Sequence, residues 1–196
     1  LRNPGAVDTN GDGKADRAYA GDLKGTLWKF DLSSATEASW TASALYATSP
    51  AQPITATPGV ALHPNGGYMV AFGTGSMLDT ADTTANTVHY VYGVWDGAPV
   101  ANTAMMGATP PPPHATLEER SYVNAGTTTR VRRSLTITTP VWSSGGHKGW
   151  RVALPAGEKV GGEGSFIESG RFYFSTHNPT VSVLTGATTV KSVTVT

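Results

Sequence analysis

The sequence predicts an all-β protein of short antiparallel strands with little or no helix, and three observations point to this class. The 196 residues include 23 glycines and 13 prolines, while charged residues make up only 14% of the chain, which is typical of a turn-rich β protein. No stretch places apolar residues at helical spacing between two caps. Runs rich in β-branched and aromatic residues instead recur between turn sequences.

The strand-forming runs follow one another along the chain. In order they occupy residues 17–20, 25–31, 55–62, 68–73, 88–95, 117–123, 129–138, 149–154, 171–176 and 188–196. Turn sequences separate several of them, as at residues 22–25, 64–67 and 168–170. We therefore expect about ten short antiparallel strands.

Two of these runs are variants of one unit, which predicts a modified or partial β-propeller. Residues 25–31 and 91–96 both carry aromatic or aliphatic side chains at alternate positions and close on an aspartate, as a strand of a propeller blade does. Trp28 and Trp95 are expected to be buried in related blade positions. About ten strands make about three four-stranded blades, fewer than the four to eight that close a ring. Residues 1–196 are therefore predicted to be a single domain or a segment of a larger β-propeller.

Composition disfavours or excludes several classes of function. The formal net charge is zero, so no global field attracts nucleic acid. The absence of cysteine excludes disulfides, thiolate zinc sites and iron–sulfur clusters. No run approaches the roughly 20 apolar residues of a transmembrane helix, so no transmembrane segment is expected. Residues 97–114, with four consecutive prolines, predict a proline-rich surface excursion.

The most specific motif is the loop at residues 8–16, Asp-Thr-Asn-Gly-Asp-Gly-Lys-Ala-Asp. Oxygen-bearing side chains stand at its positions 1, 3, 5 and 9, which are Asp8, Asn10, Asp12 and Asp16. Ca²⁺ takes six to eight oxygen ligands at roughly 2.3 to 2.6 Å, and this spacing lets one short loop surround one ion. Lys14, at position 7, would contribute its backbone carbonyl. The motif predicts a calcium site.

The loop differs from an ordinary EF-hand. Tyr19 stands at the twelfth position, where a bidentate glutamate belongs, and a strand follows instead of a helix, so Asp16 must close the site. The alternative is a solvated turn in which Asp and Asn side chains bind their own backbone. The five histidines are scattered and give little support to a zinc or nucleophile site. Asp79 and Asp82 are candidates for an acid–base pair or a second cation site, although a polar loop after a strand accounts for them equally.

With these residues assembled, the chain resembles the C-terminal β-propeller of the PilY/PilC family of type IV pilus tip-associated adhesins and biogenesis factors. The acidic loop runs directly into residues 17–31, and further blocks follow in the family's order. These blocks are residues 53–58, 69–75, 91–96, 149–155 and 170–179. As an ordered set they are specific. Residues 180–196 do not resemble the family's usual continuation, and the chain holds no Arg-Gly-Asp sequence.

The resemblance implies a non-catalytic, calcium-binding propeller at the extracellular pilus tip or outer membrane surface, reached through the periplasm. The implied partners are minor pilins or the pilus tip complex, together with host or abiotic surfaces. The implied role is to oppose pilus retraction and to support twitching motility and surface attachment. The family's loop maps residue by residue, with Asp8, Asn10, Asp12 and Asp16 as side-chain ligands and Lys14 acting through its carbonyl.

Two other interpretations stay open. Residues 20–28 partly match the repeated tryptophan-docking segment of propeller dehydrogenases that hold pyrroloquinoline quinone beside Ca²⁺. Such an enzyme needs several copies of that segment, and the sequence has one good copy. The other interpretation is a non-catalytic exported structural β domain, which a lack of Ca²⁺ binding would favour.

Overall fold

The computed structural model describes residues 1, 3–48, 51–97, 117–120, 122–125, 132–135, 148–161, 165–179 and 189–194. In this part of the chain, regular structure consists of short strands and two 3₁₀ turns, η1 (Glu37–Ser39) and η2 (Thr80–Thr83). The predicted all-β class with little helix is confirmed. None of the described helices is long and apolar enough to cross a membrane. The proline-rich excursion predicted at residues 97–114 lies, apart from Gly97, outside the described residues.

The first sheet is a meander of four antiparallel strands that are consecutive in the chain. They are β1 (Gly5–Val7), β2 (Arg17–Gly21), β3 (Thr26–Asp31) and β4 (Thr41–Ala47), in this spatial order. The turn between β2 and β3 requires a left-handed backbone, which Gly25 adopts with φ +85°. A Cβ on Gly25 would also lie 2.1 Å from the hydroxyl oxygen of Thr48, so glycine is required there for space as well as for conformation.

The second sheet lies in the middle of the molecule. Its strands are β5 (Gly59–Leu62), β6 (Tyr68–Gly73), β7 (Tyr90–Asp96), β11 (Gly149–Ala153) and β8 (Leu117–Arg120), in this spatial order. The first four pair antiparallel, whereas β8 pairs parallel with β11, which departs from the expected antiparallel pattern. Parallel neighbours need a long connection, and this one contains the hairpin of β9 (Tyr122–Ala125) and β10 (Arg132–Leu135).

The third sheet is built around β14 (Arg171–His177). Three strands pair with it: β12 (Lys159–Val160), β13 (Phe166–Glu168) and β15 (Thr189–Thr194). The final strand corresponds to the Thr/Val alternation predicted at residues 188–196. Within the C-terminal stretch that looks unlike the family, residues 189–194 are therefore part of the sheet, since β15 pairs along most of β14.

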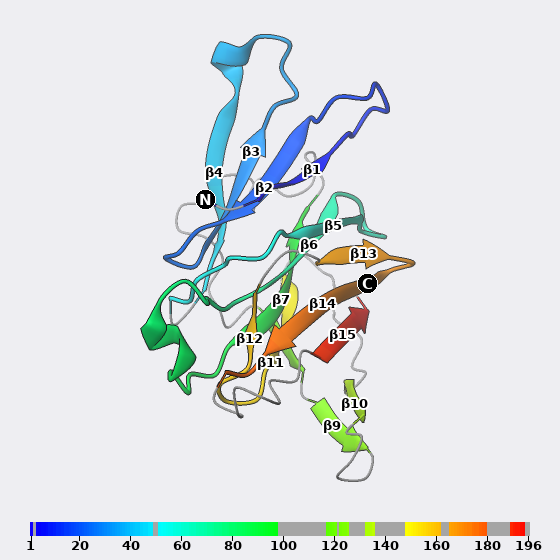
Figure 1. The fold of residues 1–196 in the computed structure, drawn as a ribbon. Helices are drawn as coiled ribbons and strands as arrows, with labels where there is room; N and C mark the ends of the chain where they lie inside the picture. Colours follow the sequence, from blue (N-terminus) through cyan, green and yellow to red (C-terminus); the bar gives the residue numbers. More distant parts are fainter. Residues whose placement is uncertain are drawn as a thin grey trace.

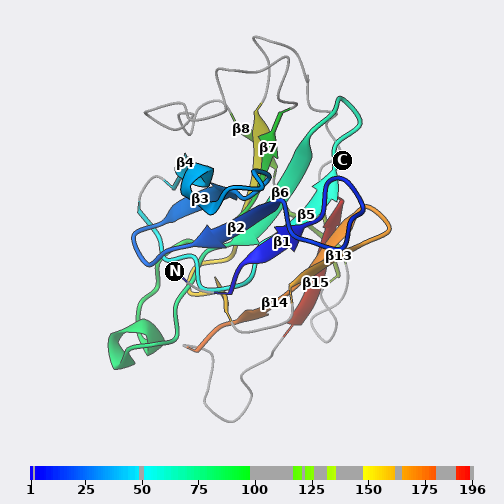
Figure 2. The ribbon, with the colours of Figure 1, turned by 90° about the horizontal axis from the view of Figure 1, so that it is seen from above.

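The three sheets are arranged as neighbouring blades, as Figure 1 shows. The strand β5 contacts β1 of the first sheet and β13 of the third, and Figure 2 shows these three strands together. The approach is close: a Cβ on Gly5 would lie 2.3 Å from the carbonyl oxygen of Pro58, just before β5. Three sheets that meet through β1, β5 and β13 are consistent with a partial propeller.

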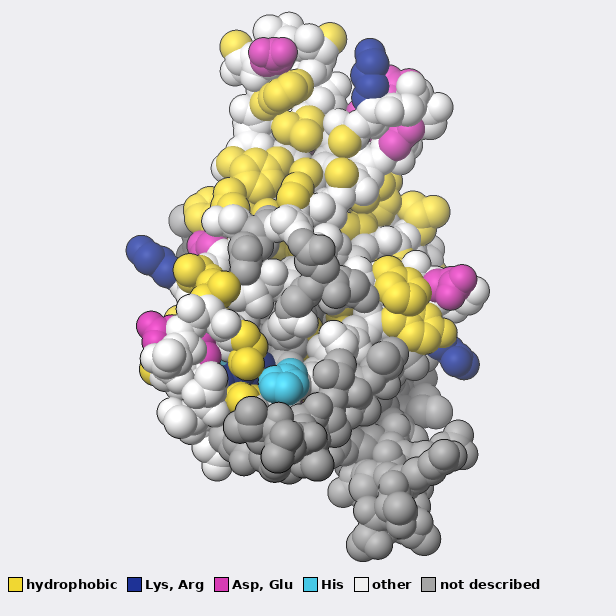
Figure 3. All heavy atoms as spheres, viewed as in Figure 1, with side chains coloured by type: hydrophobic (Ala, Val, Ile, Leu, Met, Phe, Trp, Pro, Cys, Tyr) yellow, Lys and Arg dark blue, Asp and Glu magenta, His cyan; other side chains and the backbone are white. Residues whose placement is uncertain are grey.

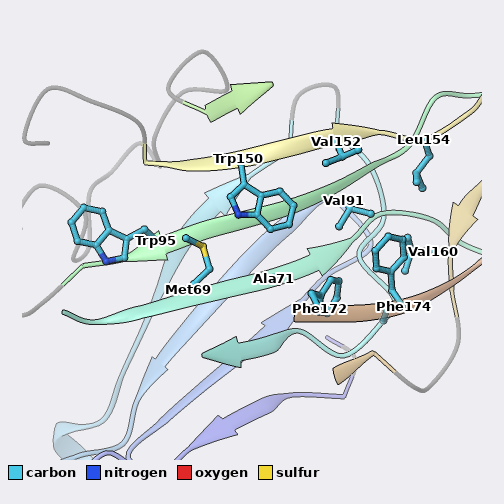
Figure 4. Packing of buried hydrophobic residues seen from close by; sticks show 11 residues of the cluster. Met69, Ala71, Val91, Trp95, Trp150, Val152, Leu154, Val160, Phe172 and Phe174 are labelled. Atoms are coloured by element: carbon cyan, nitrogen blue, oxygen red, sulfur yellow. The ribbon is translucent and has the colours of Figure 1, made fainter. Parts of the chain in front are cut away.

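The core consists of two hydrophobic clusters, one on each face of the second sheet. Along β6, Met69 and Ala71 belong to the cluster shared with the third sheet, whereas Val70 and Phe72 belong to the cluster shared with the first. This alternation follows from the period of two along a strand. Figure 4 shows the cluster between the second and third sheets, where Phe172 and Phe174 lie against the middle sheet. Because both faces of β6 and β7 are covered, these strands read as continuous apolar runs.

The burial predicted for the two tryptophans is confirmed only for Trp95. Trp95 is 8% exposed, and its indole N–H donates to the carbonyl of Gly66 at 2.8 Å. Trp28 is half-buried, because its two neighbours in β3, Leu27 and Lys29, face the second sheet and the alternation turns Trp28 to the opposite face.

The strand β4 was not predicted, since its sequence Thr-Ala-Ser-Ala-Leu-Tyr-Ala is rich in residues of low β propensity.

Candidate calcium loop and the charge cluster beside it

Residues 8–16 form the connection between β1 and β2. The hairpin is closed at its base, where the backbone N–H of Asp16 donates to the carbonyl of Val7 at 2.9 Å. Gly11 and Gly13 adopt φ +80° and +84°, and a Cβ on either would meet nothing within 4 Å. Glycine is therefore needed at these two positions for the left-handed backbone and not for space. The tip of this hairpin projects from the upper part of the molecule in Figure 1, and Figure 3 shows charged side chains gathered there.

The acidic side chains fold back onto the loop's own backbone. Asp8 accepts from the N–H groups of Gly11 at 2.7 Å and Gly13 at 2.8 Å. Asn10 accepts from Asp12 N–H, and Asp12 accepts from Lys14 N–H, both at 2.9 Å. Successive turns of this kind hold the oxygen-bearing side chains along the curved path of the loop. The turn predicted as the alternative to a metal site is thus present in the structure.

Asp16 differs from the other loop carboxylates because it is buried, at 7% exposure. Its Oδ2 accepts from both the backbone N–H and the hydroxyl of Thr9, which joins the end of the loop to its beginning. Its own carbonyl accepts from the N–H of Leu32, just beyond β3. Asp16 therefore anchors the loop to the first sheet.

The backbone donors also affect the ionisation of Asp8. The N–H groups of Gly13 and then of Gly11 hold the pKa of the Asp8 carboxyl below its ordinary value, because they stabilise the charged form. Asp8 is fully exposed, so this effect is local and is screened by solvent. The carboxylate is thus ionised at neutral pH, as a ligand of a hard cation must be.

The chemistry of the predicted ligands fits a hard cation. Each of the four side chains can offer an oxygen atom, and Lys14 offers its carbonyl oxygen. Within the described residues, no three His, Cys, Asp or Glu side chains lie close enough together to hold a metal ion. Asp8, Asp12 and Asp16 would therefore have to move toward one another to bind one. The loop brings the right donors into one short segment without gathering its three carboxylates around one point.

A buried charge cluster that the sequence did not reveal lies beside the base of this loop. Asp96, at the end of β7, is fully buried. It accepts from Lys29 Nζ at 2.8 Å and from the hydroxyl of Tyr19 at 2.7 Å. The Arg17 guanidinium lies 3.7 Å from the same carboxylate and 5.6 Å from the ring centroid of Tyr68. We refer to Asp96, Lys29, Tyr19 and Arg17 as the Asp96 cluster.

Burial, followed by the charge of Asp96, raises the pKa of Tyr19, so its hydroxyl stays protonated and donates. In the sequence, Asp96 looked like the turn aspartate of a blade. Its burial depends on a sheet that packs over it, which no local pattern indicates.

The other candidate residues have structural roles. Asp79 and Asp82 form a reciprocal capping box at η2, in which Asp79 accepts from Ala81 N–H at 3.0 Å. His63 stacks on Trp95 with the ring centroids 4.7 Å apart, and His89 is buried beside Thr74. Two of the remaining histidines, at positions 114 and 147, lie outside the described residues.

Comparison with known proteins identifies the family. The family model of the PilY1 beta-propeller domain matches residues 1–121, more than half of the chain. The chain belongs to the PilY1 family. The resemblance inferred from the ordered blocks is thereby confirmed.

Two relatives show how much of a PilY1 protein is represented. A type IV pilus biogenesis factor PilY1 homolog of Xylella fastidiosa is 33% identical over 205 residues, which cover 93% of this chain and 13% of that protein. The type IV pilus biogenesis factor PilY1 of Pseudomonas aeruginosa is 37% identical over 137 residues, covering 56% of this chain and 12% of that protein. The chain thus spans about an eighth of the length of these PilY1 relatives.

The fold is shared with a solved PilY1 structure. The crystal structure of the Pseudomonas aeruginosa PilY1 C-terminal domain matches with a TM-score of 0.80 and 27% identity. The match covers 97% of this chain and 46% of that domain, so it extends into residues 180–196. The predicted partial propeller is confirmed.

One further site can be placed within this PilY1 fold, the single tryptophan-docking segment. Asp22 accepts from the indole N–H of Trp28 at 2.9 Å and from the N–H of Thr26 at 2.8 Å. The corresponding Trp95 of the second sheet donates to a backbone carbonyl instead. The hydrogen bonds between Asp22, Thr26 and Trp28 therefore stabilise the turn between β2 and β3.

Proposed function

We propose that this chain is a non-catalytic, calcium-binding part of a type IV pilus biogenesis factor. In this role it opposes pilus retraction and supports twitching motility and surface attachment. The observation that carries the proposal is the oxygen-only loop at residues 8–16, joined to a blade of a PilY1 propeller. The proposed setting is the extracellular pilus tip or outer membrane surface, with minor pilins or the tip complex as partners.

The proposed site uses Asp8, Asn10, Asp12 and Asp16 through their side chains and Lys14 through its carbonyl. A bound Ca²⁺ would neutralise carboxylates that otherwise repel one another in one short loop. Asp16 is already tied to the first sheet, so closure of the loop would fix where β2 begins. The occupied and empty loops are two local states, and binding to one of them shifts the population between them. A tip factor with such a loop would oppose retraction when occupied and permit it when empty.

Calcium binding is tested by thermal unfolding of the chain with chelator and with millimolar Ca²⁺. Binding to the folded state alone contributes about 2.7 kcal/mol at a hundredfold excess over Kd, so the melting temperature should rise. Asp16→Ala should abolish the rise because it removes the closing ligand. Asp79→Ala is the matched control, since this exposed aspartate caps η2 outside the loop. Identical melting curves with and without Ca²⁺ would refute the site and favour a purely structural β domain.

The role in the pilus is tested in cells that carry substitutions in the full-length protein. Asp12→Ala should mimic the empty loop and reduce surface pili and twitching. Asp12→Lys places an ammonium among the remaining carboxylates and should partly restore both. Normal piliation and motility in both strains, with Ca²⁺ binding lost, would make the site structural and end the switching proposal.

The quinoprotein alternative has a separate and inexpensive test. A bound quinone absorbs visible light, so a coloured preparation would support the dehydrogenase. We expect a colourless protein that binds Ca²⁺, because Asp22 and Trp28 contact each other within their own turn.

A further inference from the structure

The Asp96 cluster joins two sheets at the point where the acidic loop begins and ends. Asp96 belongs to β7 of the second sheet, whereas Tyr19 and Lys29 belong to β2 and β3 of the first. Tyr19 and Lys29 are direct partners across these two strands, so both reach the same carboxylate. Asp96 is 0% exposed and Lys29 is 4% exposed. A buried carboxylate requires such partners, because an uncompensated buried charge is strongly unfavourable.

The loop and the cluster meet in two consecutive residues. The Asp16 side chain accepts from Thr9 and closes the loop. The Arg17 side chain lies against Asp96 and over the ring of Tyr68, which is the register partner of Asp96 on β6. Asp16 and Arg17 are consecutive, so one short piece of backbone carries both a side chain that closes the loop and a side chain that contacts Asp96. A displacement of Asp16 therefore also displaces Arg17.

We propose that the Asp96 cluster couples cation binding in the loop to the packing of the first sheet on the second. This inference rests on the calcium site proposed above. Closure of the loop fixes the position of Asp16. Because Arg17 and Tyr19 follow Asp16 in the chain, closure also fixes their contacts with Asp96 on the second sheet. Coupling is reciprocal: the factor by which a bound cation favours the packed arrangement of the two sheets is also the factor by which the intact cluster strengthens cation binding. Lys29, Tyr19 and Arg17 are thus positioning residues for the loop and not ligands.

The variant Lys29→Met tests this by the sign of its effect. The Ca²⁺ affinity of the whole chain is measured by calorimetry. Coulomb's law alone predicts tighter binding, because the substitution removes a positive charge near a cation site. Coupling predicts weaker binding, by about tenfold, because the buried Asp96 carboxylate loses its nearest cation and the packing of the two sheets loosens. Phe174→Leu is the matched control, since it disturbs the other interface and should leave Ca²⁺ affinity unchanged.

Two further measurements cover the case in which Lys29→Met does not fold. Arg17→Gln also removes a positive charge but from a less buried position, and coupling again predicts weaker and not tighter Ca²⁺ binding. In the unmodified chain, Ca²⁺ should slow hydrogen exchange more strongly in the loop and at the end of β7 than in β14.

The outcomes separate this inference from the proposed function. If the unmodified chain binds no Ca²⁺, both are overturned. If it binds Ca²⁺ but the affinity is unchanged or tighter in the charge variants, the coupling is overturned and the site stands. Protection from exchange that is confined to residues 8–16 also overturns the coupling.

Discussion

His89 shows how a single buried residue acquires a property that its sequence context does not indicate. It is 6% exposed, and its Nδ1 lies 3.3 Å from the hydroxyl oxygen of Thr74. Burial, together with the positive charge of Lys159, lowers the pKa of His89 to about 4. The side chain is therefore neutral in the folded protein over the range in which an unfolded histidine becomes charged.

This difference predicts a loss of stability in mild acid. The contribution of His89 is fully present above the unfolded pKa of about 6.5 and is lost as the pH falls toward 4, because protonation favours the unfolded chain. His89→Asn should therefore show a smaller drop in unfolding free energy between pH 7 and pH 5, by roughly 1 kcal/mol after allowance for screening. Urea unfolding at the two pH values measures this. Equal drops in the two proteins would contradict the assignment.

At the scale of the element, the close packing of β7 against β11 depends on a glycine. A Cβ on Gly93 would lie 2.3 Å from the indole ring of Trp150, its register partner on β11. The ring of Trp150 therefore covers the backbone of Gly93. The alternation of β7 predicts which face Gly93 is on, but not that an aromatic ring lies flat against it.

Gly93→Ala should consequently force the Trp150 ring off its position and destabilise the protein by about 1–3 kcal/mol. Gly161→Ala is the control, because the nearest atom to its added Cβ would be Met77 Cγ at 3.8 Å, an ordinary contact. Chemical unfolding followed by tryptophan fluorescence compares the two. A Gly93→Ala protein as stable as the control would show that Trp150 can move without cost.

The elements themselves were predictable to different degrees. The runs around β3 and β6 were predicted within a residue of their observed ends, since they combine β-branched and aromatic residues with clear turns. The predicted run at residues 55–62 was too long, because only Gly59–Leu62 pair with β6. β4 was missed because its pairing with β3, and not its own propensity, makes it a strand.

At the scale of the whole molecule, the second sheet has a hydrophobic cluster on each face and so joins the other two. We expect one cooperative unfolding transition, because neither outer sheet keeps its core without the middle one. Phe72→Ala at one interface and Phe174→Ala at the other should each cost about 3–5 kcal/mol. Both should shift the same transition when it is followed by circular dichroism and fluorescence. Two separate transitions would mean that the interfaces unfold independently.

The amino-acid sequence alone was sufficient for the all-β class, for the family and for the candidate loop. The class and the loop depend on relations between nearby residues: the alternation along a strand, the turn residues and the oxygen spacing of residues 8–16. The family depends on the order of several sequence blocks along the chain. The Asp96 cluster was decided only by the tertiary structure. Asp96 meets Lys29 and Tyr19 across 67 and 77 residues of chain, and these contacts exist because one sheet packs on another. Strand alternation specifies which side of a strand a residue lies on, but the partner that it meets there depends on how the sheets are placed.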